Sequence, residues 1–409
     1  MAEQHEKALV PQIRFTGFTD PWEQRKLGEL TESYSGGTPA AGESEFYGGS
    51  IPFIRSAEIA AESTELFLTE KGYESSSARM VKPGDVLYAL YGATSGEVAV
   101  SRQKGAINQA ILAILPRDDC DARYITAWLR KQKGYIVTTY LQGGQGNLSG
   151  VIVKNLEVFI PSLPEQQKIG FMLSHLDSLI TLHQRKYDKL CVLKKSMLDK
   201  MFPKGGSLYP EIRFAGFTDP WEQRKLGEVA RRVTRKNENR DSDLPLTISA
   251  QYGLVDQRTF FNNQVASKDM SGYFLLRKGE FAYNKSTSTD SPWGAIKRLE
   301  KYDMGCVSTL YICFELLSGD PDFLVTYYET DRWYKAVQLI AAEGARNHGL
   351  LNIAPDDFFE TQICIPKRID EQRQIGAFFD RLDSLITLHQ RKLELLRNIK
   401  KSMLDKMFV

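Results

Sequence analysis

The sequence predicts a mixed α/β (α+β) protein in which two similar domains are joined by two long antiparallel helices, with a pseudo-two-fold, circular organisation. Two observations predict this architecture. Blocks of near-identical sequence recur after roughly 200 residues, which is too long a period for a solenoid unit, so each copy should be a whole domain with a connector. Each half also ends in a long stretch with helical periodicity. Two related domains on one chain imply two related sites.

The repeats stand at the start and at the end of each half. Residues 11–30 read PQIRFTGFTDPWEQRKLGEL, and residues 210–229 read PEIRFAGFTDPWEQRKLGEV. Two further pairs are identical: LDSLITLHQRK at 176–186 and 382–392, and KKSMLDKMF at 194–202 and 400–408. The middle of the chain holds the long-helix block and the opening block together, whereas the termini carry these two pieces apart. We therefore predict that the two chain ends lie close together.

The segments between the repeats differ in sequence but share a frame of matched positions. Short apolar runs between glycines predict strands, three in each segment: 85–90, 97–100 and 107–115, then 281–284, 293–299 and 306–316. Residues 121–134 and 320–334 are expected to be short helices, each with an Asp near its start. Each segment is therefore predicted to be an α/β or mostly-β domain.

The connectors are predicted to be two long helices. In the second copy the apolar residues recur at spacings of three and four, which places them on one face: Leu382, Leu385, His389, Leu393, Leu396, Ile399, Met403 and Met407. At a rise of ~1.5 Å per residue, a helix near forty residues long spans about 55–60 Å. The shared stripe favours an antiparallel coiled-coil pair that acts as a spacer. The alternative is two helices that pack separately on their own domains.

These elements divide the chain into six predicted parts. They are an N-terminal repeat segment (1–29), a first divergent domain (30–160), a central long-helix connector (161–209), a repeat of the opening segment (210–228), a second divergent domain (229–365) and a C-terminal long-helix connector (366–409).

The composition is that of an ordinary soluble protein and disfavours several classes. Hydrophobic residues make up 42% and charged residues 25%, and the net charge is +2, so any basic surface for nucleic acid must be local. No apolar run reaches transmembrane length, and the N-terminus lacks the apolar stretch of a signal peptide. The five cysteines form no CxxC pair and suit neither a zinc site nor a disulfide framework. We expect a reduced, cytoplasmic protein with buried thiols and no membrane contact.

The motifs of common enzyme classes are missing from the sequence. It contains no P-loop, no HExxH, no GxGxxG that opens a helix, and no Asn-Pro-Pro-aromatic signature of adenine methyltransferases. The five histidines form no constellation, and His183 and His389 repeat at positions that favour packing between the long helices. We expect a chain that is not an enzyme by itself; a stand-alone nuclease or methyltransferase is the rival reading.

Several motifs, taken in order, resemble the specificity subunit of type I restriction–modification systems. They are FTDPWEQRKLGE in each half, GATSGEVAV at 92–100, AINQAI at 106–111, GGQGNLS at 143–149, and PSLPEQQKIG and PKRIDEQRQIG before the long helices. The resemblance covers essentially the whole chain after the first ten residues. The second half departs from it in the loops at 284–294 and 344–352, as expected of a domain that reads a different half-site.

This resemblance implies two target-recognition domains, each reading one half of a bipartite, asymmetric site in double-stranded DNA, with the paired helices setting the unread spacer. It implies two modification subunits that carry S-adenosylmethionine and methylate adenine, and restriction (translocase/endonuclease) subunits in the same host-defence complex. No cofactor is expected on this chain. The alternative is a two-domain scaffold that binds protein or glycan and not DNA.

Polar residues in the loops of the divergent segments are the candidates for DNA reading, because Asn and Gln can pair with adenine and Arg with guanine. In the first domain they are Thr94, Ser95, Gln145, Asn147 and Ser149, with Arg79 and Lys82 as phosphate candidates. In the second domain they are Asn284, Lys285, Ser286, Thr289, Arg346, Asn347 and His348. Weaker candidates are Thr38, Arg55, Gln251 and Tyr252. The alternative is that such glycine-flanked polar residues only build turns.

The near-identical blocks suggest shared assembly. They are the natural docking place for the modification subunits, with Trp22 and Trp221 as candidate aromatic anchors; packing inside the chain is the alternative role of these rings. The blocks are also more alike than a shared fold requires. We hypothesise that recombination between them exchanges recognition domains, and sequencing of many sibling clones that never finds a rearrangement would count against this.

Overall fold

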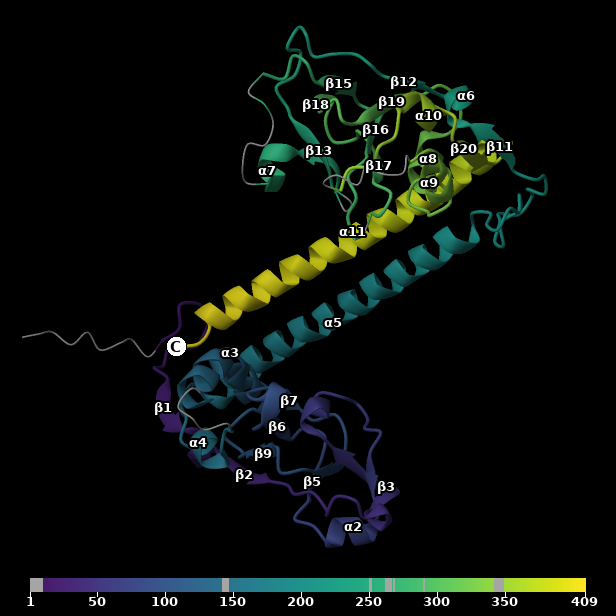
Figure 1. Ribbon diagram of the computed structural model, residues 1–409. Coiled ribbons are helices and arrows are strands. Elements are labelled where there is room, and N and C mark those ends of the chain that lie inside the picture. The colour runs from purple at the N-terminus through teal and green to yellow at the C-terminus, as the bar shows by residue number, and fades with distance from the viewer. Residues whose placement is uncertain are drawn as a thin grey trace, which may run out of the picture. The chain divides into compact units, whose positions relative to one another are not determined.

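A computed structural model describes residues 10–141, 147–249, 252–261, 267, 269–289, 291–341 and 349–409. The chain divides into two compact units: Met1–Arg185 together with Gln390–Val409, and Lys186–His389. The long helices α5 (Leu163–Lys200) and α11 (Ile369–Lys406), the teal and yellow ribbons of Figure 1, each contribute residues to both units. The predicted mixed fold with two long helices is confirmed.

Among the described residues, the first unit contains two four-stranded sheets. One is antiparallel in the order β2 (Thr31–Ser35), β9 (Ile111–Pro116), β6 (Val86–Ala89), β7 (Val98–Val100). The other has the order β4 (Phe67–Leu68), β3 (Tyr47–Ile54), β8 (Gly105–Ile107), β5 (Arg79–Val81), with β3 and β8 parallel. The short helices of this unit are α1 (Leu27–Leu30), η1 (Ser44–Phe46), η2 (Ser56–Glu58), α2 (Glu70–Glu74), η3 (Gly92–Thr94) and α4 (Gly150–Lys154).

Strand β6 shows how the sequence builds two cores. Val86 and Tyr88 join the core that contains residues of helix α3 (Ala122–Leu141), whereas Leu87 and Ala89 join the core shared with β3, β5 and β8. Successive side chains of a strand point to opposite faces, so an apolar run of this kind is buried on both sides. Helix α3 starts where predicted, because the Asp121 carboxylate accepts a 2.9 Å hydrogen bond from Tyr124 N.

The second unit repeats this plan with a different second layer. Its main sheet has the order β12 (Ala230–Arg232), β19 (Ile312–Leu316), β16 (Phe281–Asn284), β17 (Ala295–Arg298). Phe281 and Tyr283 join one core and Ala282 the other, as in β6. The remaining elements are β13 (Leu246–Ser249) paired with β14 (Gly253–Asp256), β15 (Phe274–Arg277) paired with β18 (Met304–Val307), α6 (Leu226–Val229), α7 (Gln257–Phe261), α8 (Pro321–Tyr327), α9 (Tyr334–Ile340) and α10 (Pro355–Phe359).

Each opening repeat forms a strand beside the strand that precedes a long helix. In the first unit β1 (Glu23–Lys26) pairs with β10 (Glu157–Ile160), and in the second β11 (Glu222–Lys225) pairs with β20 (Gln362–Ile365). The sequence EQRK thus has the same structural role in both copies.

The first turn of each long helix is held by a buried carboxylate. Glu165 accepts hydrogen bonds of 2.7 and 2.8 Å from Arg14, and Glu371 accepts bonds of 2.7 and 2.8 Å from Arg213. Both glutamates are at most 1% exposed. The following glutamines, Gln166 and Gln372, accept from the backbone N–H of Asp121 and Asp320 at 3.0 and 2.8 Å. The EQ motif therefore fixes each helix start to its domain.

The described chain ends meet, as the split repeat predicts. Ile13 N donates to Lys406 O at 3.0 Å, and in the middle of the chain Ile212 N donates to Lys200 O at 2.9 Å. The aromatic contacts also repeat. The ring of Phe408 lies 6.5 Å from Trp22 and 5.2 Å from Tyr124, whereas Phe202 lies 5.8 Å from Trp221 and 5.7 Å from Phe323.

The long helices contact each other as an antiparallel pair within each unit. In the first unit Asp177 pairs with Lys400 and Gln184 accepts from Arg397, so the residue number rises on one helix as it falls on the other. In the second unit Lys194 pairs with Asp383. The apolar face predicted for the second long helix includes Leu385, and this is wrong, because Leu385 is 44% exposed. Leu382, Leu393 and Met407 of the same face are buried.

Local hydrogen bonds changed three predicted elements. The runs 107–115 and 306–316 each form two strands, because a polar residue turns the chain: Asn108 Oδ1 accepts from Ala110 N at 3.1 Å, and Ser308 Oγ from Leu310 N at 3.4 Å. The helix expected at 320–334 is two helices, α8 and α9, with a turn between them in which the Thr330 hydroxyl donates to Tyr327 O at 2.6 Å.

Candidate nucleic-acid interface

In the first domain, the structure brings two of the predicted loops together. Leu90 O accepts a 3.0 Å bond from Leu148 N and a 3.3 Å bond from the Ser95 hydroxyl, so the turn at 91–96 lies beside the segment 147–149. Asn147 and Ser149 are exposed, and Thr94 is half-buried with its hydroxyl 3.4 Å from Tyr91 O. We call residues 91–96 and 147–149 the first loop cluster.

The second domain pairs its loops at the equivalent place. Leu351 N donates to Lys285 O at 3.0 Å, and Thr287 N donates to Gly349 O at 2.7 Å. Ser286 and Thr289 are exposed. We call residues 284–289 and 349–351 the second loop cluster. Gly96 and Gly294, which lead into β7 and β17, both have φ of 80°, a value that favours glycine, so the two hairpins turn alike although their sequences differ.

Several predicted residues build the turns, as the alternative reading expects. Ser95 is 9% exposed and its hydroxyl donates to the backbone. Ser149 caps α4 by accepting from Ile152 N at 3.3 Å. Asn284 Oδ1 accepts from Ser286 N at 3.0 Å. Besides Ser149, the exposed predicted residues in the described part of the clusters are Asn147, Ser286 and Thr289. Ser288 is exposed too, and its Oγ accepts from Ser291 N at 3.1 Å.

Lys285 is half-buried under its own loop. Its Nζ donates to Ile353 O at 3.2 Å, and burial lowers the pKa of Lys285 from its ordinary value. The ammonium therefore ties the segment 284–289 to Ile353, two residues after the segment 349–351, a structural role that the sequence did not indicate.

The two phosphate candidates lie away from the first loop cluster. Arg79 is on strand β5 of the other sheet, where its guanidinium stacks 4.3 Å from the Tyr34 ring. Lys82 precedes β6, whereas the loop cluster follows β6, and it lines a cavity of about 420 Å³ with Leu163 and Gln167 at the start of α5. Both side chains are exposed. The structure does not join them to the cluster.

Four predicted residues lie outside the described residues: Gln145, Arg346, Asn347 and His348. Among the weaker candidates, Gln251 also lies outside them, while Thr38 and Arg55 are exposed and Tyr252 is 52% exposed.

The docking role predicted for Trp22 and Trp221 is wrong in this structure. Each ring is 1% exposed, so neither offers surface to a partner. Trp22 packs edge-on against Tyr124 at 6.1 Å, and Trp221 donates from Nε1 to Glu371 Oε1 at 3.2 Å. An aromatic ring wedged between an opening segment and a helix end gains more from burial than from exposure. Packing within the chain is their role.

Sequence reasoning missed a cluster of cations in the first unit. Arg102, Arg123, Arg130 and Lys400 line a cavity of about 250 Å³ together with Asp177. Arg123 and Arg130 stand seven residues apart on α3, which places them on one face of that helix, and this spacing was the available signal. Within the described ranges, no group of three or more His, Cys, Asp or Glu residues could hold a metal ion. None of the described helices combines the length and apolar character needed to cross a membrane.

Comparison with known proteins agrees with this geometry. Residues 19–191 match the family model of the type I restriction modification DNA specificity domain. The chain is 26% identical over 273 residues to the type I restriction enzyme MjaIX specificity subunit of Methanocaldococcus jannaschii, which covers 61% of this chain and 62% of that protein. It is 26% identical over 187 residues to the EcoR124I/EcoR124II specificity subunit of Escherichia coli, covering 41% of this chain and 46% of that protein. These matches span less than two thirds of either relative.

The fold is shared with a solved structure over its whole length. The type I restriction–modification S subunit from M. genitalium aligns with a TM-score of 0.61 at 14% identity and covers 98% of this chain and 99% of that one. The family model covers residues 19–191, and the second unit repeats the same sheet order and the same repeat contacts. Residues 19–191 thus match a type I restriction modification DNA specificity domain, and the chain is similar in sequence to type I specificity subunits.

Proposed function

We propose that this chain is the DNA sequence-specificity subunit of a type I restriction–modification complex, and that each domain reads one half of a bipartite, asymmetric site in double-stranded DNA. One observation carries the proposal: each domain has a loop cluster at the equivalent place on its own four-stranded sheet, yet the exposed polar residues of the two clusters differ. Base edges in the major groove are distinguished by donor and acceptor patterns, so different polar side chains on one scaffold suit different sequences.

The paired helices set the spacer in this proposal. Each is a continuous element of 38 residues whose residues belong to both units, and at ~1.5 Å per residue it is about 57 Å long. Half-site separation is a geometric property of the protein that carries the two readers.

Catalysis resides in partner subunits in this proposal. Two modification subunits carry S-adenosylmethionine and methylate adenine, and restriction subunits join them in the cytoplasm, while this chain scaffolds the assembly. The surfaces of α5 and α11 are the docking candidates, since exposed apolar side chains occur along both: Phe171, Leu182, Val192, Leu385, Leu388 and Leu395.

The proposal is tested by selection from random duplexes with the chain co-expressed with a modification subunit. We expect a split motif with two defined half-sites, a fixed unread gap and a methylatable adenine in each half. Enrichment of no sequence, together with binding that is insensitive to salt, would leave the rival reading of a protein- or glycan-binding scaffold. Binding through Z phosphates weakens with a slope of roughly −0.9Z in log salt, so the two readings separate clearly.

A further inference from the structure

The long helices carry the same ion pair twice. In the first unit Lys400 of α11 donates to Asp177 of α5, and in the second unit Lys194 of α5 donates to both oxygens of Asp383 of α11 at 2.6 and 2.8 Å. Asp177 and Asp383 hold the same position in LDSLITLHQRK, and Lys400 and Lys194 the same position in KKSMLDKMF. We call each of these the helix Asp–Lys pair. The repeat therefore places one anion and one cation at the same point of both units.

The two domains contact this pair with opposite charges. In the first unit Arg130 of α3 donates to Asp177 at 2.6 Å. In the second unit Glu329, just after α8, lies 2.7 Å from the ammonium of Lys194. Arg130 and Glu329 are equivalent, because each stands nine residues after the aspartate that caps its helix, Asp121 or Asp320. One domain uses the anion of the pair and the other uses the cation.

The inversion extends to the neighbouring positions. Two residues after the capping aspartate stands Arg123 in the first domain and Asp322 in the second. Val100 pairs with Val86 in the first domain, and Arg298 pairs with Phe281 in the second, so Val100 and Arg298 are equivalent. Two residues further on, the first domain has Arg102 and the second has Glu300. Three arginines of the first domain thus correspond to three carboxylates of the second, Arg102, Arg123 and Arg130 to Glu300, Asp322 and Glu329. In the second domain Arg298 pairs with Glu300 and Asp322, and Lys297 lies 3.7 Å from Glu329, so the domain itself partly neutralises these carboxylates. The sign of the side chain changes at these three positions, while the helix Asp–Lys pair keeps both of its charges.

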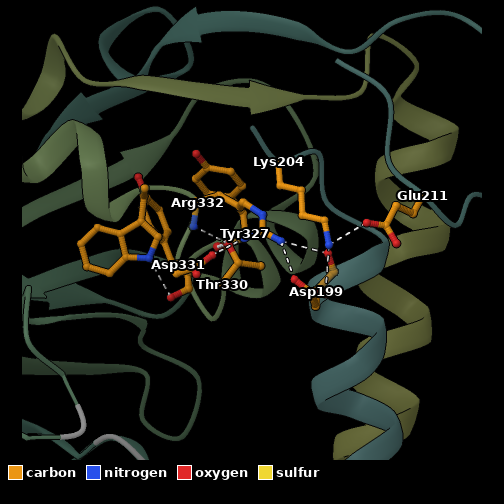
Figure 2. A network of polar contacts seen from close by, with 9 residues as sticks. Asp199, Lys204, Glu211, Tyr327, Thr330, Asp331 and Arg332 are labelled. Atoms are coloured by element: carbon orange, nitrogen blue, oxygen red, sulfur yellow. Dashed lines mark hydrogen bonds and ion pairs between the residues drawn. The ribbon is translucent and has the colours of Figure 1, made fainter. Parts of the chain in front are cut away.

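A second contact between domain and helix shows no such change of sign. There the helix end offers only hydrogen-bond acceptors, and the domain residue is a cation in both units. At the end of α5, Arg332 donates to Asp199 O at 2.9 Å and to the Asp199 carboxylate at 3.1 Å, as Figure 2 shows. After α11, Lys131 donates to Phe408 O at 3.2 Å. Carbonyls at a helix C-terminus carry partial negative charge and accept only donors. Both domains accordingly present a cation there.

We propose that the helix Asp–Lys pair is a charge-ambivalent docking point, which accepts a recognition domain with a cation or with an anion at the position of Arg130 and Glu329. Either charge finds a partner, so neither leaves an unpaired charge in this half-buried place, where Arg130 is 36% and Lys194 17% exposed. Identical helices can then carry domains of different surface charge. That these domains recognise DNA rests on the proposed function, whereas their docking on the helices does not.

A double-mutant cycle on the full-length chain tests this proposal by thermal unfolding. Arg130→Glu should lower the unfolding midpoint by no more than about 2 °C beyond Arg130→Met, because both variants lose the 3.2 Å bond from Arg130 Nε to Val98 O, while the new carboxylate meets Lys400. Lys400→Met alone should also have little effect, since Arg130 still pairs with Asp177. The combination should lower the midpoint by about 4 °C or more, because two carboxylates then face each other and both cations that contact Asp177, Arg130 and Lys400, are gone. The mirror variants are Glu329→Arg and Asp383→Asn in the second unit.

Arg332→Glu is the matched control. This variant also replaces a domain cation by an anion, but the new carboxylate faces the Asp199 carbonyl and carboxylate. It should therefore lower the unfolding midpoint whether or not Lys400 or Asp383 is also changed. The proposal is overturned if Arg130→Glu or Glu329→Arg alone destabilises as much as Arg332→Glu, or if Lys400→Met and Asp383→Asn leave the reversals unaffected. Unfolding is measured without DNA, so a failure here is distinct from a failure to find a bipartite DNA site.

Discussion

At the scale of single residues, two polar side chains of one loop have different roles. The Ser149 hydroxyl caps α4 by accepting a hydrogen bond, whereas Asn147, two residues earlier, is exposed. Sequence alone gave both the same weight, because a polar residue beside glycine suits a turn and a base equally well. Base contact needs an outward side chain, which only the fold decides. Asn147, Ser286 and Thr289 meet that condition.

The substitutions Asn147→Ala and Ser149→Ala should therefore separate reading from folding. Asn147→Ala should lower the preference for one base in one half-site by about tenfold and leave the unfolding midpoint unchanged, since a good bidentate contact contributes about 1–3 kcal/mol. Ser149→Ala should lower stability by about 1 kcal/mol through loss of the cap. Duplex competition and thermal unfolding measure the two effects, and equal loss of preference from both variants would contradict the assignment.

Burial protects most of the thiols. It raises the pKa of Cys120 and Cys313 to about 12 and that of Cys306 and Cys364 to about 11, from an ordinary value of 9.0. The neutral thiol is favoured in the folded state, so this stabilisation is full below pH 9 and declines as the pH rises toward these pKa values. At pH 8 a thiol reagent should label these four cysteines slowly in the native protein and quickly in denaturant. Fast native labelling of Cys120, read by mass spectrometry, would contradict this.

At the scale of elements, periodicity predicted the long helices and the strands β6, β7, β16 and β17, but it missed the turns inside two apolar runs and gave no prediction for most other strands. The strand at 281–284 and the two long helices follow from apolar spacing, because burial of a face is what that spacing encodes. The breaks after residues 107 and 307 depend on one side-chain bond each, from Asn108 and Ser308, which leaves no mark on the apolar pattern. The pairing of loops into clusters is a long-range property of the sheet that spacing within one segment does not carry.

The start of each long helix offers a sharp stability test. Glu165→Gln leaves Arg14 without its charged partner in a place where Glu165 is fully buried, and breaking such a pair costs about 3–5 kcal/mol. Glu371→Gln should do the same in the second unit. Glu45→Gln, which removes the anion of the exposed Glu45–Lys71 pair, is the control and should have no measurable effect. Equal effects of Glu165→Gln and Glu45→Gln in denaturant unfolding would contradict the role given to the EQ motif.

At the scale of the whole molecule, the order of the repeats explains how the chain ends are used. The last residues pack on the first domain as residues 200–202 pack on the second, and this followed from the sequence because the terminal pieces together reproduce the central block. The role of the two tryptophans did not follow, because a repeat shows that a residue is used twice but not whether it faces inward.

Phe408→Ala and Phe202→Ala should accordingly destabilise different units by similar amounts. Each ring is at most 4% exposed in an aromatic core, and loss of a buried Phe costs about 3–5 kcal/mol. Hydrogen exchange should show increased opening in residues 10–160 for Phe408→Ala and in residues 222–365 for Phe202→Ala. A loss of protection confined to the last turn of α11 would contradict the closure of the chain through Phe408.

In the proposed function, the two domains read two half-sites independently. The most direct measurement replaces residues 30–160 with the matching segment of another type I specificity subunit and repeats the selection from random duplexes with the modification subunit present. We expect that one half-site changes, while the other half-site and the length of the unread gap stay the same. A change in both half-sites, or an unchanged motif, would contradict it.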